Sequence, residues 1–179
     1  DSVLAVARRI SGFSRCQGAW SHRGRYQRVS DTVHYRSFLS QLEEQASMRT
    51  KNVLTQDDVK KMMAACEAEA LKHKWVVSIA IVDDAGFMLA MQRGEGAGPT
   101  TAEVSVEKAR SAALSRRSTK FWEDRIKDRP VFMKFPGNLP IQGGIPLMYQ
   151  NECVGAIGVS GVQSHEDEQI AMAGAAVLG

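Results

Sequence analysis

The alternation of hydrophobic and polar residues divides the chain into helical and extended segments. After Thr55, apolar residues recur at spacings of three, four and seven as far as about Lys72, which predicts an amphipathic helix with Thr55 as its N-cap. Residues 75–82 are almost continuously apolar and rich in β-branched side chains, so they predict a strand that is covered on both faces. A turn at Gly86 and the apolar residues 87–93 predict its hairpin partner.

Two further helices and a shaped loop are predicted next. Thr100 or Thr101 supplies an N-cap for the first helix, and its many small residues suit close packing against a sheet. Residues 119–126 predict a short helix that ends before Pro130. Residues 135–147 then contain three prolines and three glycines, so they predict a semi-rigid loop that runs into the next strand.

The remaining segments complete the pattern. Residues 145–149 and 153–159 predict a second hairpin. A capping sequence that starts at Ser164 predicts a final helix over residues 168–177. The resulting order of helix, hairpin, two helices, loop, hairpin and helix predicts an α+β fold, in which helices pack on a mostly antiparallel sheet.

Length and composition limit the number of domains and the type of protein. A chain of 179 residues can bury one good core. Its longest apolar run, residues 75–82, is far too short to span a bilayer, so we predict no membrane partner. Three cysteines without metal-ligand spacing predict neither a disulfide framework nor a zinc site, and they favour a cytoplasmic location.

Residues 1–47 differ from the rest of the chain in charge and in pattern. They contain seven Arg, no Lys and four acidic residues, whereas residues 48–179 contain sixteen basic and sixteen acidic residues. We interpret the first segment as an Arg-rich appendage: a disordered arm, a transit peptide, or upstream sequence before a start at Met48. Residues 48–179 are then the folded domain. Because the excess positive charge has no recognition fold beside it, we predict no nucleic-acid partner.

Several polar residues are candidates for catalysis in a cleft between the second helix and the loop. Arg93 can bind a carboxylate through two hydrogen bonds, while Lys108 and Glu103 can transfer protons or stabilise an enolate-like state. The backbone amides of Gly143 and Gly144 can add donors. Structural explanations stand beside these roles: a surface ion pair for Arg93, a capping acid for Glu103 and simple turns for the glycines. Lys108 either extends from the core edge to solvent or points into a cleft.

From Leu54 to Val177 the sequence resembles the haem-degrading, GlcG/HbpS-like family, which includes haem-binding proteins and the C-terminal domain of PduO-type proteins. The resemblance rests on the order of several motifs: Leu54-Thr55, residues 78–83 with Gly86, residues 91–93, Glu107-Lys108-Ala109, residues 135–137, residues 143–147, residues 154–161 and Asp167-Glu168. It implies a profilin-like domain with about five antiparallel strands flanked by helices, which assembles into dimers or higher oligomers. Since the pattern predicts four strands, a fifth is expected near Gly98–Thr101 or in the central loop.

The resemblance also implies a function. Members of the family bind haem or a corrinoid, and others occur among catabolic genes. Haem iron needs an axial ligand, and of the four histidines His73 lies on an apolar helical face. His22 and His34 lie in the appendage, and His165 lies at the start of the last helix. We therefore expect a haem or related tetrapyrrole as ligand, with or without degradation of haem, and His73 as the candidate axial ligand.

Two alternatives stay open. One is a small enzyme, an isomerase, hydratase or lyase, that acts on a carboxylate-bearing catabolic intermediate in a pocket lined by Arg93, Glu103 and Lys108. The other is a structural or sensory oligomer without such a site. The residues expected to contact a ligand are Thr101, Phe135, Pro136, Gly143 and Gly144.

Overall fold

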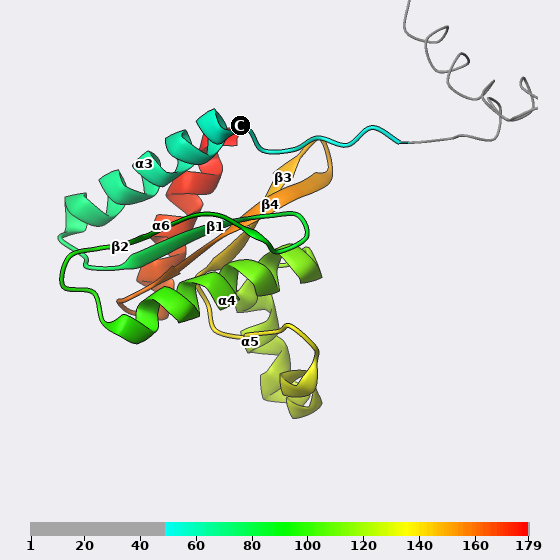
Figure 1. Cartoon of the computed structure of the whole chain (residues 1–179). Helices are drawn as coiled ribbons and strands as arrows, with labels where there is room; N and C mark the ends of the chain where they lie inside the picture. Colours follow the sequence, from blue (N-terminus) through cyan, green and yellow to red (C-terminus); the bar gives the residue numbers. More distant parts are fainter. Residues whose placement is uncertain (1–48, 179) are drawn as a thin grey trace, which may run out of the picture. The chain divides into compact units, whose positions relative to one another are not determined.

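The computed structural model of the chain describes residues 49–178. The interpretation of residues 1–47 as an appendage, together with His22 and His34, lies outside these residues. The described elements follow one another along the chain as shown in Figure 1: α3 (Gln56–His73), β1 (Ser78–Asp83), β2 (Met88–Arg93), α4 (Pro99–Ser115), α5 (Thr119–Asp128), the 3-10 helix η1 (Pro130–Lys134), β3 (Gly144–Tyr149), β4 (Glu152–Ser160), α6 (Ser164–Ala175) and the 3-10 helix η2 (Ala176–Leu178). No helix within residues 49–178 is both long and apolar enough to cross a membrane.

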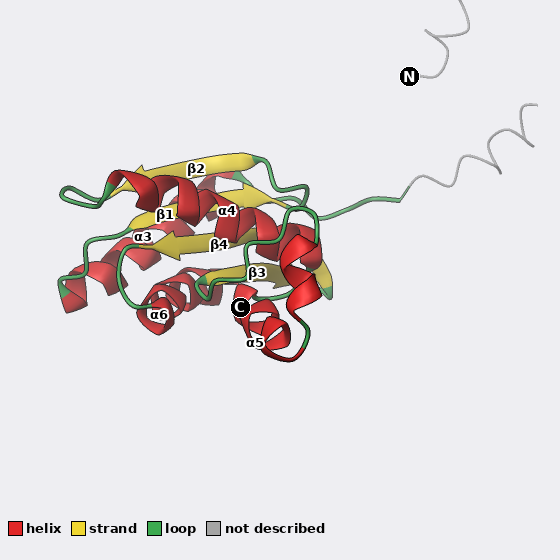
Figure 2. Cartoon of the chain, turned by 90° about the horizontal axis from the view of Figure 1, so that it is seen from below, coloured by secondary structure: helices red, strands yellow, loops and turns green. Residues whose placement is uncertain are grey.

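Four antiparallel strands form one sheet in the order β2-β1-β4-β3 (Figure 2). The α+β fold and both hairpins are confirmed. β1 and β4 join the two hairpins, with Ser78 opposite Ser160 at one end of the pairing and Asp83 opposite Gly155 at the other. The described part of the chain contains no fifth strand, because Gly98 caps α4 and residues 135–143 form a loop.

Helices cover both faces of this sheet. α3 and α6 pack against each other on one face, over a core that includes Ile79 and Ile81 of β1. α4 packs on the opposite face, against Ala80 and Val82 of the same strand (Figure 2). Successive side chains of a strand point to opposite faces, so β1 contributes to both cores. The prediction of a strand covered on both faces is confirmed.

The start of α3 agrees with its sequence signal. Thr55 is the N-cap, and its Oγ1 accepts a hydrogen bond from the Asp58 N–H at 3.2 Å. Asp58 Oδ2 accepts a hydrogen bond in return from the Thr55 N–H at 2.9 Å. This reciprocal capping box satisfies backbone donors that the first turn of a helix leaves free.

The start of α4 differs from the prediction. Pro99 is its first residue and Gly98 its N-cap, without any side-chain cap, so the assignment of Thr100 or Thr101 as N-cap is wrong. Proline suits this first position because its φ is already helical and it has no N–H to satisfy. The Thr101 hydroxyl instead donates to the Gly98 carbonyl at 2.7 Å and lies 2.8 Å from the Ser78 Oγ.

Small residues bring α4 close to the sheet, as its sequence predicts. A Cβ atom on Gly144 of β3 would lie 2.5 Å from the Lys108 carbonyl oxygen of α4. A Cβ atom on Gly158 of β4 would collide with the Ser105 carbonyl oxygen and the Ala109 nitrogen of the same helix. Glycine at these two positions is therefore required for the close approach of helix and strands.

Candidate functional site

Lys108 lies in the interior, between α4 and the start of α6. Its side chain is 2% exposed, and Nζ donates to Asp167 Oδ2 at 2.8 Å and to the Val159 carbonyl at 2.9 Å. The side chain therefore neither reaches solvent nor points into an open cleft. Burial raises the pKa of Asp167, and the ammonium of Lys108 opposes that shift.

Gly143 packs over this ion pair, and Gly144 packs against the backbone of Lys108. Gly143 has a φ of 121°, which glycine adopts readily, and a Cβ atom there would lie 2.9 Å from Lys108 Nζ. The Gly144 N–H donates to the Thr119 Oγ1 at 2.8 Å. The structure thus brings Lys108, Gly143 and Gly144 together, but in a buried setting where the amide of Gly144 already has a protein partner.

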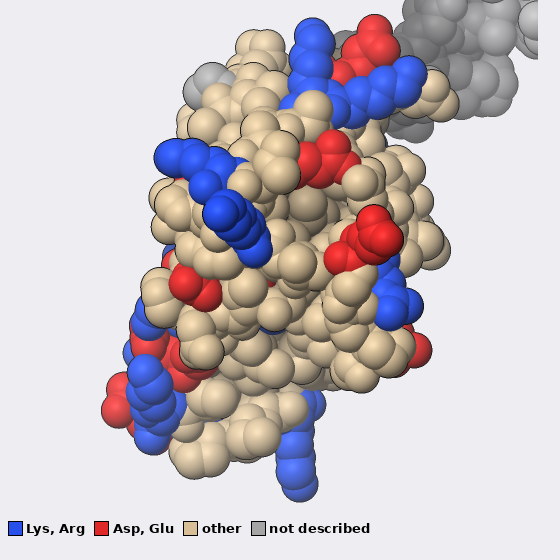
Figure 3. Space-filling view, turned by 90° about the vertical axis from the view of Figure 1, so that its left-hand side faces the viewer, with Lys and Arg blue, Asp and Glu red and all other residues tan. Residues whose placement is uncertain are grey.

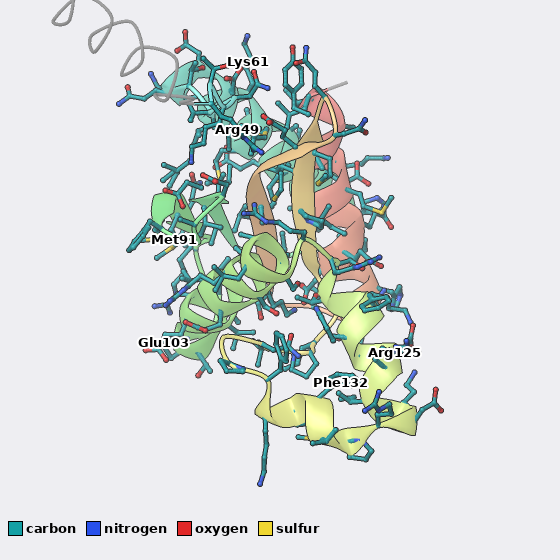
Figure 4. The ribbon with its side chains drawn as sticks, turned by 90° about the vertical axis from the view of Figure 1, so that its right-hand side faces the viewer. Arg49, Lys61, Met91, Glu103, Arg125 and Phe132 are labelled. Carbon is teal, nitrogen blue, oxygen red and sulfur yellow. The ribbon has the colours of Figure 1, made fainter. Side chains whose placement is uncertain are left out.

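The other two residues considered for catalysis lie apart from this cluster. The Arg93 Nε donates to the Ala97 carbonyl at 2.8 Å, next to the end of β2. Glu103 is exposed and projects outward from α4 (Figure 4). Within residues 49–178, no hydrogen bond or ion pair joins Arg93, Glu103 and Lys108 to one another.

Phe135 and Pro136 lie at a different place, beside α5 and η1. Both residues are exposed, and the Phe135 ring stacks on Trp122 with centroids 5.5 Å apart. Phe132 packs against the same indole, and Figure 4 shows it at the end of the domain that also carries Arg125. The indole N–H of Trp122 is buried and has no hydrogen-bond partner among the described residues.

His73 is the last residue of α3, and its ring stacks on Trp75. The two ring centroids are 4.3 Å apart, with an angle of 17° between the planes. His73 Nε2 forms a hydrogen bond with Glu69 Oε1 at 3.1 Å, and Gln169 of α6 donates to the same carboxylate oxygen at 2.6 Å. The hydrogen bond from Gln169 is the main reason why the pKa of Glu69 is lowered. The imidazole is therefore held by contacts from two helices and one indole.

Trp75 also lines a cavity of about 310 Å³ between α3, β1 and the end of β2. Small-molecule sites commonly span about 300–1,000 Å³, so the cavity can enclose a small ligand or part of a large one. Figure 3 views the end of the domain where α3 stops and α4 begins, where basic and acidic side chains are spread among uncharged residues. The cavity is lined by apolar residues and three polar ones: Ala70, Leu71, Trp75, Val76, Val77, Ile79, Gly94, Glu67, Gln92 and Glu95.

Three residues around Lys108 and His73 are not among the site residues that the sequence predicts: Asp167, Glu69 and Trp75. The local pattern places Asp167 in a capping sequence, and its separation from Lys108 by 59 residues leaves no spacing signal. Glu69 and His73 are four residues apart on one helix, so that spacing was a signal for their contact. Trp75 was assigned to the first strand, which begins only at Ser78.

Known proteins with similar sequences cover most of the described residues. The model of the family described as haem degrading protein HbpS-like matches residues 54–176. The protein GlcG of Escherichia coli strain K12 is 42% identical over 114 residues, which cover 63% of this chain and 85% of GlcG. An uncharacterised 15.0 kDa protein from the dhaT-dhaS intergenic region of Citrobacter freundii is 33% identical over 119 residues, covering 63% and 82% of the two chains.

Solved structures extend the likeness to the fold. The crystal structure of HbpS has a TM-score of 0.70 and 36% identity, and the match covers 74% of this chain and 95% of HbpS. A complex of PduOC with heme has a TM-score of 0.66 at 21% identity, with 72% and 96% of the chains covered, and supports the fold alone. The chain therefore belongs to the family of haem-degrading, HbpS-like proteins, as its motifs predict.

Proposed function

We propose that the protein binds a tetrapyrrole of the haem type beside Trp75, with His73 as the iron ligand. The observation that carries this proposal is the stacking of His73, which also contacts Glu69, on Trp75. Trp75 in turn lines a mostly apolar cavity, of which His73 itself is not a lining residue. The family supports it, because its description refers to haem.

The contacts of His73 suit a metal ligand. Ligating histidines usually donate their second ring N–H to a carboxylate or carbonyl group. If Nε2 donates to Glu69 in this way, Nδ1 would be the ring nitrogen left to hold an iron. The histidine side chain is 34% exposed, so a ligand can reach it from solvent. Haem iron is commonly held by an axial protein ligand, and a single histidine can provide it.

Titration with haemin tests the proposal. The full-length protein should give a sharp, saturable change in the Soret region, with about one haem per chain or per dimer. His73→Ala should abolish this change, since it removes the ligand. His165→Ala is the matched control and should bind haemin normally, because His165 is exposed at the start of α6. A diffuse, unsaturable spectrum that is the same in His73→Ala would contradict the proposal.

Within the described part of the chain, no contact favours the alternative of a carboxylate-processing enzyme. That function requires Arg93, Glu103 and Lys108 in one cleft, whereas Lys108 is buried against Asp167 and Glu103 faces solvent. We therefore propose binding ahead of catalysis. A role in haem degradation or catabolism and a cytoplasmic location stay predictions.

We further propose that the protein forms homo-oligomers. β2 is an edge strand, so its outer backbone groups are free to pair with another strand. The turn before β2 and the strand itself expose four large apolar side chains: Phe87, Met88, Leu89 and Met91. Figure 4 shows Met91 at the surface. An exposed apolar edge strand of this kind favours association with a second copy.

A further inference from the structure

The cavity beside Trp75 carries two acidic residues on an otherwise mostly apolar wall. Glu67 belongs to α3, and Glu95 follows β2. Neither carboxylate forms an ion pair within residues 49–178, whereas the nearby Lys72 pairs with Glu69 at 3.5 Å. Among residues 49–178, no Lys or Arg side chain lines the cavity. The ionisable side chains of the lining are therefore both acidic.

The aromatic lining residue also favours a positive charge. Tryptophan provides the best ring among the side chains for a cation, because its π face is electron-rich. The apolar lining from Val76, Val77 and Ile79 suits a hydrocarbon or aromatic group. An anionic ligand of the same shape would have to place its charge beside Glu67 and Glu95, which costs free energy.

We propose that this cavity selects ligands in which an apolar or aromatic body carries an ammonium group. Trp75 and the aliphatic side chains bind the body, and Glu67 and Glu95 stabilise the charge. This selectivity concerns the cavity itself and requires neither iron nor His73. It also predicts that a haem bound here turns its carboxylate edge away from Glu67 and Glu95.

Calorimetric titration of the full-length protein with two probes of opposite charge tests the inference. The probes are 2-phenylethylammonium and 3-phenylpropionate, which share a phenyl ring and have chains of similar length. The ammonium probe should bind saturably and about tenfold more tightly than the carboxylate probe. Added salt should reduce the difference, since the two carboxylates lie at an accessible cavity.

Conservative variants identify the residues responsible. Glu67→Gln and Glu95→Gln keep the side-chain shape and should each reduce the preference for the ammonium probe about threefold, and the double variant should abolish it. Glu107→Gln is the control, because Glu107 is an exposed acid on α4 that pairs with Arg110. Circular dichroism verifies that each variant is folded.

Three outcomes would overturn the inference: no saturable binding of the ammonium probe, equal binding of the two probes, or an unchanged preference in the double variant. All three are measured without haemin. A failure of the haemin titration is therefore distinguishable from a failure of the charge preference.

Discussion

The buried pair of Lys108 and Asp167 is the residue-scale feature with the largest expected effect on stability. A buried charge is costly unless it is paired and hydrogen-bonded, and here Lys108 has both the Asp167 carboxylate and the Val159 carbonyl. Asp167 Oδ1 also accepts a hydrogen bond from the Val162 N–H at 3.2 Å. The pair therefore joins α4, the end of β4 and the start of α6.

Replacing one partner of this pair should destabilise the fold. Lys108→Met leaves the Asp167 carboxylate buried and unpaired, so we expect the free energy of unfolding to fall by about 3–5 kcal/mol. The double variant Lys108→Met with Asp167→Leu should be more stable than Lys108→Met alone, because no charge stays buried. Urea unfolding monitored by circular dichroism measures both differences.

The pH dependence of Lys108→Met has a definite sign. Burial raises the pKa of Asp167 in the folded state, and loss of Lys108 removes an interaction that lowers it. A raised folded-state pKa means that stability is greatest at low pH and declines as pH rises through that pKa. Lys108→Met should thus lose more stability at pH 8 than at pH 5. Unfolding of Lys108→Met at the same urea concentration as the wild type would show that the pair is not structurally important.

At the scale of single elements, the capping box at the start of α3 should make the stability of the protein depend on pH. Thr55 and Asp58 exchange hydrogen bonds, and those from Thr55 are the main cause of the lowered pKa of Asp58. A carboxylate with a lowered folded-state pKa stabilises the protein above its unfolded-state pKa. That contribution is lost as pH falls through the folded-state value.

Substitutions in the capping box should therefore depend on pH. Thr55→Ala should lower the free energy of unfolding by about 1 kcal/mol near neutral pH, because the N-cap acceptor is lost. The difference in stability between wild type and Asp58→Asn should shrink as pH falls from about 6 to about 3, as Asp58 becomes protonated. Urea unfolding at several pH values measures this difference in the free energy of unfolding. Asp57→Asn, in the same helical turn but outside the capping box, is the control; an equal pH response of the two Asn variants would contradict the assignment.

The whole domain has an unequal distribution of exposed apolar side chains. Helices cover both faces of the central strands β1 and β4, whereas edge strand β2 is exposed along most of its length. Edge strands with exposed apolar residues readily pair with other strands unless charged residues interrupt them. This exposure is the physical basis of the proposed self-association.

A charge placed on β2 should disrupt the proposed oligomer. Sedimentation velocity should show wild type as a dimer or larger, and Met91→Lys as a smaller species, because a buried lysine without a partner opposes association. Met172→Lys is the matched control: Met172 is 58% exposed on α6, away from β2. A monomeric wild type, or an unchanged mass for Met91→Lys, would contradict this mode of assembly.

Local sequence patterns predicted the elements, and their limits are visible at particular residues. Alternation and helical spacing depend on neighbouring residues, so α3, both hairpins and the α+β class could be recognised from the sequence. The observed boundaries differ from the predicted ones by a few residues. The apolar run begins at Trp75, for instance, but β1 begins only at Ser78, because a strand extends only as far as its residues pair with a neighbouring strand. Pro99 favours the different start of α4, since its fixed φ and missing N–H suit the first helical position.

The sequence by itself determined the periodic elements, the absence of a membrane-length apolar run, and the family, through the order of its motifs. Only the tertiary structure decided the environment of each candidate residue. It paired Lys108 with Asp167, packed Gly143 over that pair, stacked His73 on Trp75 and made Trp75 part of a cavity wall. The physical reason is that burial and pairing depend on side chains far apart in the sequence, whose contacts no local spacing encodes.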